Sequence, residues 1–401
     1  ARARRTHPLP RLQAAARASV LMAEPFKNLL DPALVRHAGR VLERNAAGFD
    51  RRAFERRALA GLEDLEMKAR AMQIADALEA TLPASFDAAC ELIERCLAPP
   101  IPLDGEALAG PGDPQGLAGW IVWPLGEFVA RRGIAHPQRA LQALHALTQR
   151  LTAEFAIRPL IVAHPALVFA TLMHWTCDPS PHVRRLCSEG SRPRLPWGLR
   201  LKSLIDDPSP TLPILAALQD DPSAAVRRSV ANHLNDIAKD RPERVAAWVR
   251  EHLHGAPPER LALLRHASRT LIKQGHPELL ALWGAGGAFE GRCTLRLATR
   301  RLAVGDTLPF TVALRSTTTR PQRLLIDYAV HHVKADGGTR PKVFKGWTLT
   351  LQAGASVTLG KRHSLRAVTT RRYHAGRHLL ELTINGTPVA RAAFELSLTR
   401  R

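Results

Sequence analysis

A phrase of eight residues that occurs twice constrains the fold of this chain more than any other feature. Asp-Pro-Ser-x-x-Val-Arg-Arg begins at Asp178 and again at Asp221, 43 residues later, and a third Asp-Pro pair stands between them at Asp207. Aspartate caps a helix, and the following proline sits in the first turn, where its missing N–H removes no hydrogen bond. A spacing of about 40 residues is typical of two-helix repeats of the HEAT type. The phrase therefore predicts a stack of short helices that presents pairs of arginines at regular intervals.

The sequence around this phrase divides into two kinds of periodicity. Through residues 22–283, apolar residues recur at steps of three and four, which is typical of amphipathic helices. Glycine and alanine predict a linker over 284–288, and over 289–401 apolar and polar residues alternate in about seven short runs separated by turn signals. We therefore expect a mainly α chain, in which a HEAT-like α-solenoid is followed by an all-β immunoglobulin-like sandwich without a disulfide.

The length and charge of the chain predict two domains and a polyanionic partner. The chain has 401 residues, a formal net charge of +21 and an isoelectric point near 11.1. Residues 288–401 carry 20 Lys and Arg against 6 Asp and Glu, whereas residues 22–287 carry 32 against 30. The predicted sandwich is therefore basic throughout, and a binding surface on the helical part has to come from local sorting of charge. Nucleic acid is the first expectation for the partner.

The N-terminal extension, the cysteines and the missing motifs indicate where the protein is located and argue against several enzyme classes. Residues 1–21 form a basic extension, too short in its apolar part for a secretory signal, and we expect it to be disordered. Five cysteines show no C-x-x-C spacing, and no apolar run reaches the roughly 20 residues that span a bilayer. We expect a cytoplasmic, nucleoid-associated monomer that does not engage a membrane. Because nucleotide-binding, zinc and serine-hydrolase motifs are missing, no cofactor and no metal are expected.

Three carboxylates of the helical part, each with an aromatic neighbour, are the candidate catalytic groups: Glu127, Glu154 and Asp178. A carboxylate beside a sugar C1′ stabilises an oxocarbenium ion and orients the attacking water. Glu127 and Glu154 lie on apolar segments, where a buried acid is costly unless it is functional or paired with an arginine four residues on. For Asp178 a helix cap is the alternative, because its twin Asp221 has the same local sequence.

Cations and one exposed aromatic residue around these acids are the candidate contacts to a nucleic acid. Arginines that repeat at the solenoid period align along one ridge, spaced to follow a phosphate backbone, although one arginine of each pair is expected to be solvated or to form an intramolecular salt bridge. A structural histidine is the alternative for His233. The contacts predicted in the helical part are Arg184, Arg185, Arg192, Arg194, Trp197, Lys202, Arg227, Arg228, Asn232, His233 and Lys239. Those predicted in the sandwich, for sequence-independent phosphate contact, are Lys361, Arg362, Arg371 and Arg372.

Three long segments of the helical part resemble one protein family. They run from Glu154 to Pro159, from His174 to Trp197 and from Ser229 to Ile237. These segments resemble the AlkC group of HEAT-like-repeat DNA alkylation repair glycosylases, within the AlkC/AlkD superfamily, and the likeness covers most of residues 22–280. The basic stretches of the sandwich resemble the immunoglobulin-like domain that one subgroup carries.

The resemblance implies an activity. A member of this group would excise cationic N3-alkylated bases from duplex DNA, chiefly 3-methyladenine and then 3-methylcytosine, while the base stays stacked and without flipping it into a pocket. An N3-alkylated purine is already a good leaving group, so the enzyme need only stabilise charge at C1′ and position a water. The alternative is a non-catalytic HEAT-repeat protein that binds DNA or serves as a protein-interaction scaffold.

The resemblance also implies roles for particular residues. Glu127 and Glu154 would stabilise the transition state and orient the water, with Asp178 as a further acid. The residues that would contact sugar and groove are Phe128, Trp175 and Trp197, and Arg158 would lie beside the lesion or its flanking phosphate.

Overall fold

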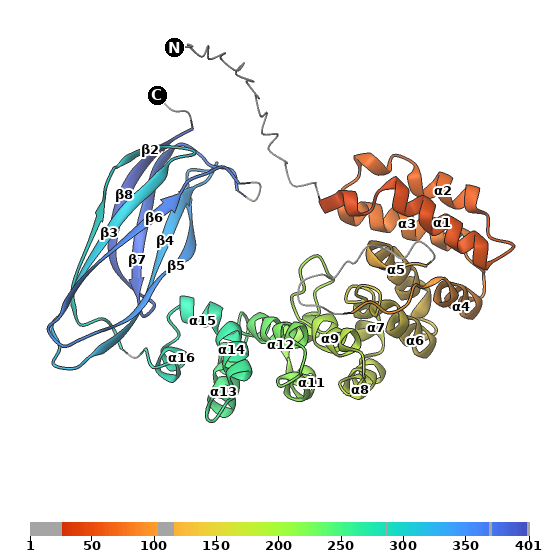
Figure 1. Cartoon of the computed structure of the whole chain (residues 1–401), viewed down its shortest axis with the longest axis horizontal. Helices are drawn as coiled ribbons and strands as arrows, with labels where there is room; N and C mark the ends of the chain where they lie inside the picture. The colour runs from red at the N-terminus through yellow and green to blue at the C-terminus, as the bar shows by residue number, and fades with distance from the viewer. Residues whose placement is uncertain (1–25, 103–115, 286, 369–370, 399–401) are drawn as a thin grey trace, which may run out of the picture.

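The computed structural model describes residues 26–102, 116–285, 287–368 and 371–398. Helices fill the part up to Leu282 and strands the part from Gly291 onward, so the predicted order of a helical solenoid and a β-sandwich is confirmed. The helices follow one another along an arc, and the sandwich rises from the end of this arc to stand opposite the first helices (Figure 1). The basic extension 1–21 lies outside the described residues.

The described residues of the solenoid form sixteen α-helices and four short 3₁₀ helices. The α-helices are α1 (Pro32–Asn45), α2 (Arg51–Leu59), α3 (Met67–Thr81), α4 (Phe86–Cys96), α5 (Val122–Gly133), α6 (Pro137–Thr148), α7 (Ile157–Ala163), α8 (Pro165–Trp175), α9 (Pro181–Gly190), α10 (Lys202–Asp206), α11 (Leu212–Leu218), α12 (Ala224–Ile237), α13 (Pro242–Leu253), α14 (Pro258–Ala267), α15 (Arg269–Lys273) and α16 (Pro277–Leu282). The 3₁₀ helices are η1 (Phe26–Leu29), η2 (Leu62–Asp64), η3 (Gly119–Ile121) and η4 (Ser209–Thr211).

Helix starts follow the proline signals of the sequence. Seven of the described helices (α1, α6, α8, α9, α13, α14 and α16) begin at a proline, which has no N–H to leave unpaired in the first turn. At α1 the preceding Asp31 also accepts a hydrogen bond from the N–H of Leu34 at 2.8 Å. One continuous core, from Leu30 to Trp283, joins the helices along the arc, and within it α9 packs on α12 and α12 on α14.

The sandwich consists of two sheets with eight strands among the described residues. The strands are β1 (Gly291–Leu297), β2 (Arg301–Ala303), β3 (Thr307–Ser316), β4 (Gln322–Val333), β5 (Thr339–Leu351), β6 (Ser356–Ser364), β7 (Gly376–Ile384) and β8 (Thr387–Ser397). One sheet has the order β1-β3-β6 and the other β2-β8-β7-β4-β5; all pairs are antiparallel except β2 with β8. The alternation predicted seven strands. It missed β2, because three residues are too few to show a period of two.

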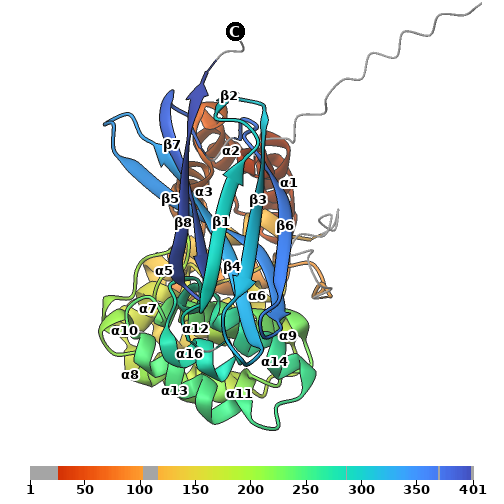
Figure 2. The same ribbon diagram turned by 90° about the vertical axis from the view of Figure 1, so that its left-hand side faces the viewer.

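The core of the sandwich comes from alternate residues of both sheets. In β3 the buried apolar side chains are Leu308, Phe310, Val312 and Leu314, and in β7 they include Leu380, Leu382 and Ile384. Because side chains alternate between the two faces of a strand, this period of two directs one face of each strand toward the other sheet. In Figure 2, where the sandwich faces the viewer, its strands run upward from the helices at its lower end.

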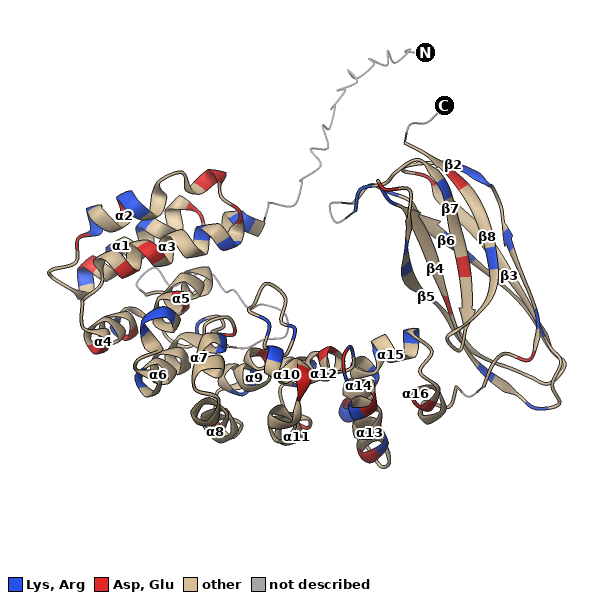
Figure 3. Ribbon diagram, turned by 180° about the vertical axis from the view of Figure 1, so that it is seen from behind, with Lys and Arg blue, Asp and Glu red and all other residues tan. Residues whose placement is uncertain are grey.

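The charged residues are distributed differently over the two parts. Figure 3 shows acids and bases mixed along the solenoid, whereas the charged residues of the sandwich are mainly Lys and Arg. No helix among the described residues is both long and apolar enough to cross a membrane.

Candidate functional site

In each repeat phrase the first arginine is used to hold the repeat together. Arg184 forms a two-pronged ion pair with Asp221 of the next phrase, at 2.6 and 3.1 Å, and donates to the carbonyl of Asp178 at 2.8 Å. Arg227 donates in the same way to the carbonyl of Asp221, at 2.5 Å. In both phrases the first arginine thus braces the turn before its own helix through backbone carbonyls, and Arg184 adds an ion pair to the next phrase.

Asp178 and Asp221 both shape the turns that precede their helices. Oδ1 of Asp178 accepts from the N–H of Ser180 at 2.8 Å, and Oδ1 of Asp221 accepts from the N–H of Ser223 at the same distance. The second oxygen of Asp178 binds Nε2 of His145 at 2.7 Å. Asp178 thus has the structural role that its twin has, with both oxygens occupied.

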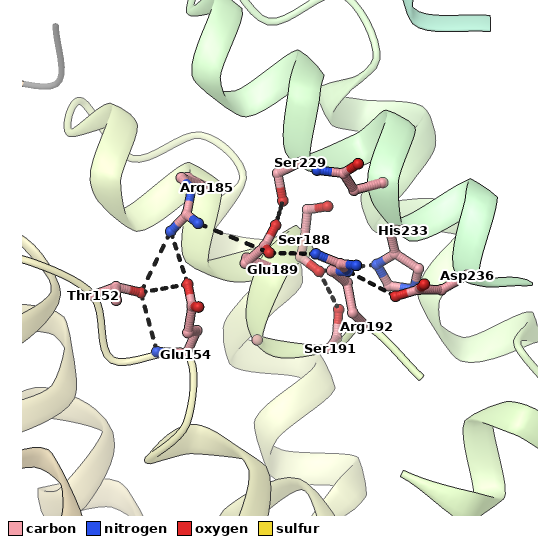
Figure 4. Close-up of polar contacts among 12 residues, drawn as sticks. Thr152, Glu154, Arg185, Ser188, Glu189, Ser191, Arg192, Ser229, His233 and Asp236 are labelled. Carbon is pink, nitrogen blue, oxygen red and sulfur yellow. Dashed lines mark hydrogen bonds and ion pairs between the residues drawn. The ribbon is translucent and has the colours of Figure 1, made fainter. Parts of the chain in front are cut away.

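The second arginine of the first phrase lies in a different environment, against Glu154. The Arg185 guanidinium, from α9, reaches Oε2 of Glu154 in the turn before α7, with 3.0 Å between Nη1 and the oxygen (Figure 4). The hydroxyl of Thr152 donates to the same oxygen at 2.8 Å and accepts from the backbone N–H of Glu154 at 3.2 Å. The Glu154 and Arg185 side chains are only 12% and 13% exposed, so this ion pair is fixed in a nearly dry setting.

Three further charged residues extend the Glu154–Arg185 pair from α9 to α12. Glu189, one helical turn after Arg185, accepts from Arg192 at 2.6 Å with Oε1 and from Ser229 at 2.6 Å with Oε2. Arg192 donates onward to Asp236 at 2.8 Å (Figure 4).

The other oxygen of Asp236 accepts from Lys239 at 2.7 Å. We call the resulting set the charged network. Its members are Glu154, Arg185, Glu189, Arg192, Asp236 and Lys239.

The charges of the charged network support one another. Burial opposes ionisation of Glu189, but the neighbouring Arg185 and Arg192 outweigh it and lower the pKa of this carboxyl. Burial likewise works against both guanidinium groups, yet Glu154 and Glu189 raise the pKa of Arg185, and Glu189 and Asp236 raise that of Arg192. The three acids and three bases of the charged network therefore alternate and pair with one another, as buried charges must.

Glu154 differs from the other two acids of the charged network in one respect that matters for chemistry. Both oxygens of Glu189 and both oxygens of Asp236 accept hydrogen bonds from protein groups. In Glu154, by contrast, Oε2 accepts hydrogen bonds from Thr152 and Arg185, and no described residue donates to Oε1. A carboxylate that is held by one oxygen and offers the other is suited to orient a water or to face a developing cation.

An aromatic cluster adjoins Glu154. The next residue, Phe155, packs on Trp123 with 4.7 Å between ring centroids, and Trp123 lies parallel to Trp197 at 6.3 Å. Phe26 contacts both Trp197, at 5.4 Å, and Trp120, at 4.8 Å. Trp197 is 59% exposed, and its φ of 63° is unusual for a residue with a side chain, so its exposed ring is held in place at a conformational cost.

Arg158 supports the loop that carries Trp197 and does not itself reach the surface. It is fully buried, and its guanidinium donates to the carbonyl of Gly190 at 2.7 Å and to that of Leu199 at 2.6 Å, at the two ends of the loop between α9 and α10. Burial, with Arg192 adding to it, lowers the pKa of Arg158 to about 10. The expectation that Arg158 touches DNA is wrong for this structure, because an arginine with no exposed atom cannot make that contact.

Glu127 lies outside the charged network. It is 4.0 Å from Arg131, which also binds Asp76 at 2.5 Å and Glu79 at 3.5 Å on α3. Burial raises the pKa of the Glu127 carboxyl, while Arg131 and Lys68 oppose that rise. Its nearest partners thus belong to the salt bridges between α3 and α5.

Several other predicted contacts are buried or already paired. Phe128 and His233 are fully buried, and Trp175 is 9% exposed and packs on His145. Burial lowers the pKa of His233 to about 4, and its Nδ1 is hydrogen-bonded to the carbonyl of Ser188, which supports the structural reading of this histidine. Direct contact by these three side chains would require them to leave the core.

Arg194 forms two bonds of 2.7 Å to Asp240. Asn232 accepts from Arg269 at 3.2 Å and lies 2.9 Å from Nε2 of His266. Arg228 and Lys202 are exposed, and neither has a hydrogen-bond or ion-pair partner within the described chain. Arg228 lines a cavity of about 390 Å³ between α12 and α14. Among the predicted contacts of the solenoid, these two cations are exposed and unpaired within the described residues.

The four predicted contacts of the sandwich differ in how free they are. The Lys361 amine donates to the carbonyls of Lys345 and Gly346 and lies 5.2 Å from the centre of the Trp347 ring, so it braces the sheet. Arg362 and Arg372 are exposed.

Arg371 binds Nε2 of His332 at 2.7 Å. Together with Arg372 it lines a cavity of about 460 Å³ whose other charged side chains are basic and which no carboxylate lines. An anion such as a phosphate group is the ligand that such a lining suits.

Sequence reasoning missed Glu189 and Asp236, which complete the charged network. A weak signal exists for Glu189, since it stands four residues after Arg185 on one helix face. For Asp236 the partner Arg192 is 44 residues away, so no local pattern could reveal the pair. Among the described residues, no group of three or more His, Cys, Asp or Glu side chains is arranged to hold a metal ion.

Comparisons with known proteins agree with this architecture. Residues 292–398 match the family model described as "Uncharacterised protein YhaZ, C-terminal Ig-like domain". The uncharacterised protein YhaZ of Bacillus subtilis (strain 168) is 36% identical over 324 residues, which are 80% of this chain and 85% of that protein. The alkylpurine DNA glycosylase AlkC of Pseudomonas fluorescens, solved bound to DNA containing an abasic site analog, matches with a TM-score of 0.83 and 34% identity over 93% of this chain and 99% of that one.

This chain belongs to the AlkC family. The agreement with AlkC spans both the helical arc and the sandwich, since it covers nearly the whole of each chain. Within the family, this chain has the form with a C-terminal immunoglobulin-like domain, which YhaZ shares. The resemblance that the sequence segments carried is thereby confirmed.

Proposed function

We propose that this protein is a monofunctional DNA glycosylase that removes cationic N3-alkylated bases from duplex DNA, 3-methyladenine first and 3-methylcytosine second. Family membership supports the class of reaction, because the AlkC structure is that of an alkylpurine DNA glycosylase bound to DNA. The observation that carries the proposal is the Glu154 carboxylate, held through Oε2 by Thr152 and Arg185 and without a protein donor on Oε1.

The proposed reaction needs only what the charged network offers. The bond between C1′ and the alkylated base breaks, and the base takes the electron pair and leaves neutral because it was a cation. The negative charge of Glu154 stabilises the oxocarbenium ion that develops at C1′. A water bound to Oε1 then attacks C1′ and gives one proton to the carboxylate, which leaves an abasic sugar.

A neutral base is a poor substrate on this account, and no base-flipping pocket is required. A neutral leaving group has to be protonated or otherwise stabilised as it departs, which is the work that a pocket around a flipped base performs. A cationic lesion carries its own driving force. The protein then has to hold the duplex so that Glu154 meets the sugar while the base remains stacked.

We place the exposed ring of Trp197 against the sugar or groove, because a face of this size stacks well on nucleotides. Arg228 and Lys202 on the solenoid, with Arg362 and Arg372 on the sandwich, are proposed to contact phosphates, since they are exposed cations. Double-stranded DNA would then lie between the solenoid and the sandwich of a single molecule.

The direct test is release of free bases from methylated duplex DNA, followed by chromatography. We expect 3-methyladenine to be released, with 3-methylcytosine released more slowly and unmethylated control DNA giving no product. Tight DNA binding without any released base would favour the alternative, a non-catalytic DNA-binding scaffold. Weak binding that hardly changes with salt would instead favour a protein-interaction scaffold.

A further inference from the structure

Two glycines from the two parts of the chain touch backbone to backbone. Gly275 lies in the turn between α15 and α16, and Gly386 lies in the turn between β7 and β8. A Cβ atom on Gly275 would lie 2.9 Å from the Cα of Gly386, and one on Gly386 would overlap the Cα of Gly275. No residue other than glycine fits on either side without moving the other backbone.

Both glycines also adopt backbone angles that favour glycine. The φ angle is +78° at Gly275 and +77° at Gly386, and Asn385 before Gly386 has a φ of 49°. Two successive residues with positive φ form the tight two-residue turn that suits the twist of a β-hairpin. The contact surfaces are therefore set by the turns themselves and not by flexible side chains.

Asn385 connects the same turn to the linker between the two parts. Its Nδ2 donates to the carbonyl of Gly287 at 3.0 Å and to that of Arg323 at 3.3 Å, and its Oδ1 accepts from the N–H of Leu325 at 2.9 Å. Asn385 is 5% exposed. The end of the solenoid, the linker and the hairpin of the sandwich thus meet at one buried point.

A small rotation at this point has a large effect at the far end of the sandwich. Strand β7 has 9 residues, and a strand of that length spans about 30 Å. A rotation of about 10° at one end would move the other end by about 5 Å, on the same strand rise. The sandwich stands opposite helices α1 to α3 (Figure 1), so this angle sets the width of the space between them.

We propose that Gly275 and Gly386 form a rigid joint that presets the sandwich opposite helices α1 to α3 before DNA binds. They are positioning residues, since they act through the placement of the sandwich cations and touch no substrate. That consequence for DNA rests on the proposed function, whereas the rigidity of the joint does not.

Matched alanine variants of the full-length chain test the joint. Gly275→Ala and Gly386→Ala place a Cβ in the contact. Gly255→Ala, in the turn after α13, and Gly354→Ala, in the turn between β5 and β6, add the same strain at φ of +68° and +65° with nothing within 4 Å of the new Cβ. Any effect of backbone strain alone is thus common to all four.

Small-angle X-ray scattering of the free protein and fluorescence anisotropy with a duplex carrying an abasic-site analogue are the two readouts. We expect Gly275→Ala and Gly386→Ala to increase the maximum dimension and to weaken DNA binding about tenfold. The two control variants should keep the wild-type scattering curve and bind within twofold of wild type.

The proposal is overturned if the free wild-type protein already scatters as a molecule with a mobile sandwich, or if the joint variants scatter and bind as the controls do. A wild-type protein that released no base would contradict the proposed function but would not affect the scattering test of the joint. The two failures are therefore distinguishable. Circular dichroism melts of all four variants would show whether a substitution has unfolded a hairpin or a helix turn. Joint variants that melt earlier than the controls but keep the wild-type scattering curve would count against the joint.

Discussion

Arg185 of α9 donates to Oε2 of Glu154, in the turn before α7, at 3.0 Å, and both side chains are nearly buried. The pair is held from both sides, by Thr152 at the glutamate and by Glu189 at the arginine, 3.9 Å from its Nη2. A carboxylate fixed in this way keeps one defined orientation for its second oxygen. The predictions that follow depend on that orientation or on the surfaces around it.

The Trp197 ring should be needed for DNA binding and not for folding. Trp197→Gly removes an exposed ring and also relieves the strain of a φ of 63°, which costs a residue with a side chain about 1 kcal/mol. Loss of the stack on Trp123 offsets part of that gain, so we expect little change in Tm and a loss of about tenfold in affinity for duplex DNA. Calorimetry and anisotropy measure the two effects. A variant that binds DNA as wild type does would remove Trp197 from the interface.

The exposed arginines should govern the salt dependence of DNA binding. Removing one protein cation that contacts a phosphate makes the negative slope of log K against log salt shallower by about one. We expect Arg228→Gln and Arg372→Gln each to do so. Arg250 of α13 is paired with Glu278 of α16, so Arg250→Gln should leave the slope unchanged. Titrations at several salt concentrations give the slopes. Equal slopes for all three variants would place the phosphates elsewhere.

Acid should destabilise the sandwich through its buried histidines. Burial, followed by Arg371 and Lys342, lowers the pKa of His363 to about 4 from an ordinary value of 6.5. The unfolded chain therefore takes up a proton that the folded chain refuses between these values, so stability is complete above pH 6.5 and falls as the pH drops toward 4, by about 1.4 kcal/mol per pH unit for one such group.

The measurement is the Tm of the sandwich transition as a function of pH, compared with His363→Phe. The variant should show a shallower decline, because one titrating group is gone. His254→Gln, which changes an exposed histidine of the solenoid, is the control and should leave the decline as in wild type. A His363→Phe protein with the full wild-type dependence would exclude His363 as a source of it.

The fold was largely predictable because its signals are local. Asp-Pro starts and apolar steps of three and four mark helices, and alternation marks strands. The pairing of Glu154 was not, and its expected partner Arg158, four residues on, illustrates why. Since α7 begins at Ile157, Glu154 precedes the helix and shares no helix face with Arg158. Arg185, 31 residues away, binds Glu154 instead, and Arg158 is left to hold a loop.

The remaining site residues escaped prediction for the same physical reason. Glu189 and Asp236 each have a partner close in sequence, but the bonds from Ser229 to Glu189 and from Arg192 to Asp236 form only because α9 stacks on α12. The sequence did show which residue types could be involved. In the first phrase, Arg184 binds the turn before α9 and Arg185 binds the charged network. This difference follows from the position of each arginine on the helix, and it was visible only in three dimensions.

The most direct measurement is the rate of 3-methyladenine release by Glu154→Gln compared with Glu127→Gln, on the same methylated duplex. Glutamine keeps the shape of each side chain and removes its charge, and Glu127 serves as the control because its salt bridges lie between α3 and α5. We predict that Glu154→Gln loses about a hundredfold in rate while it binds DNA as wild type does, and that Glu127→Gln stays within a few-fold of wild type. Release at the wild-type rate by Glu154→Gln, or a loss in Glu127→Gln alone, would contradict the account.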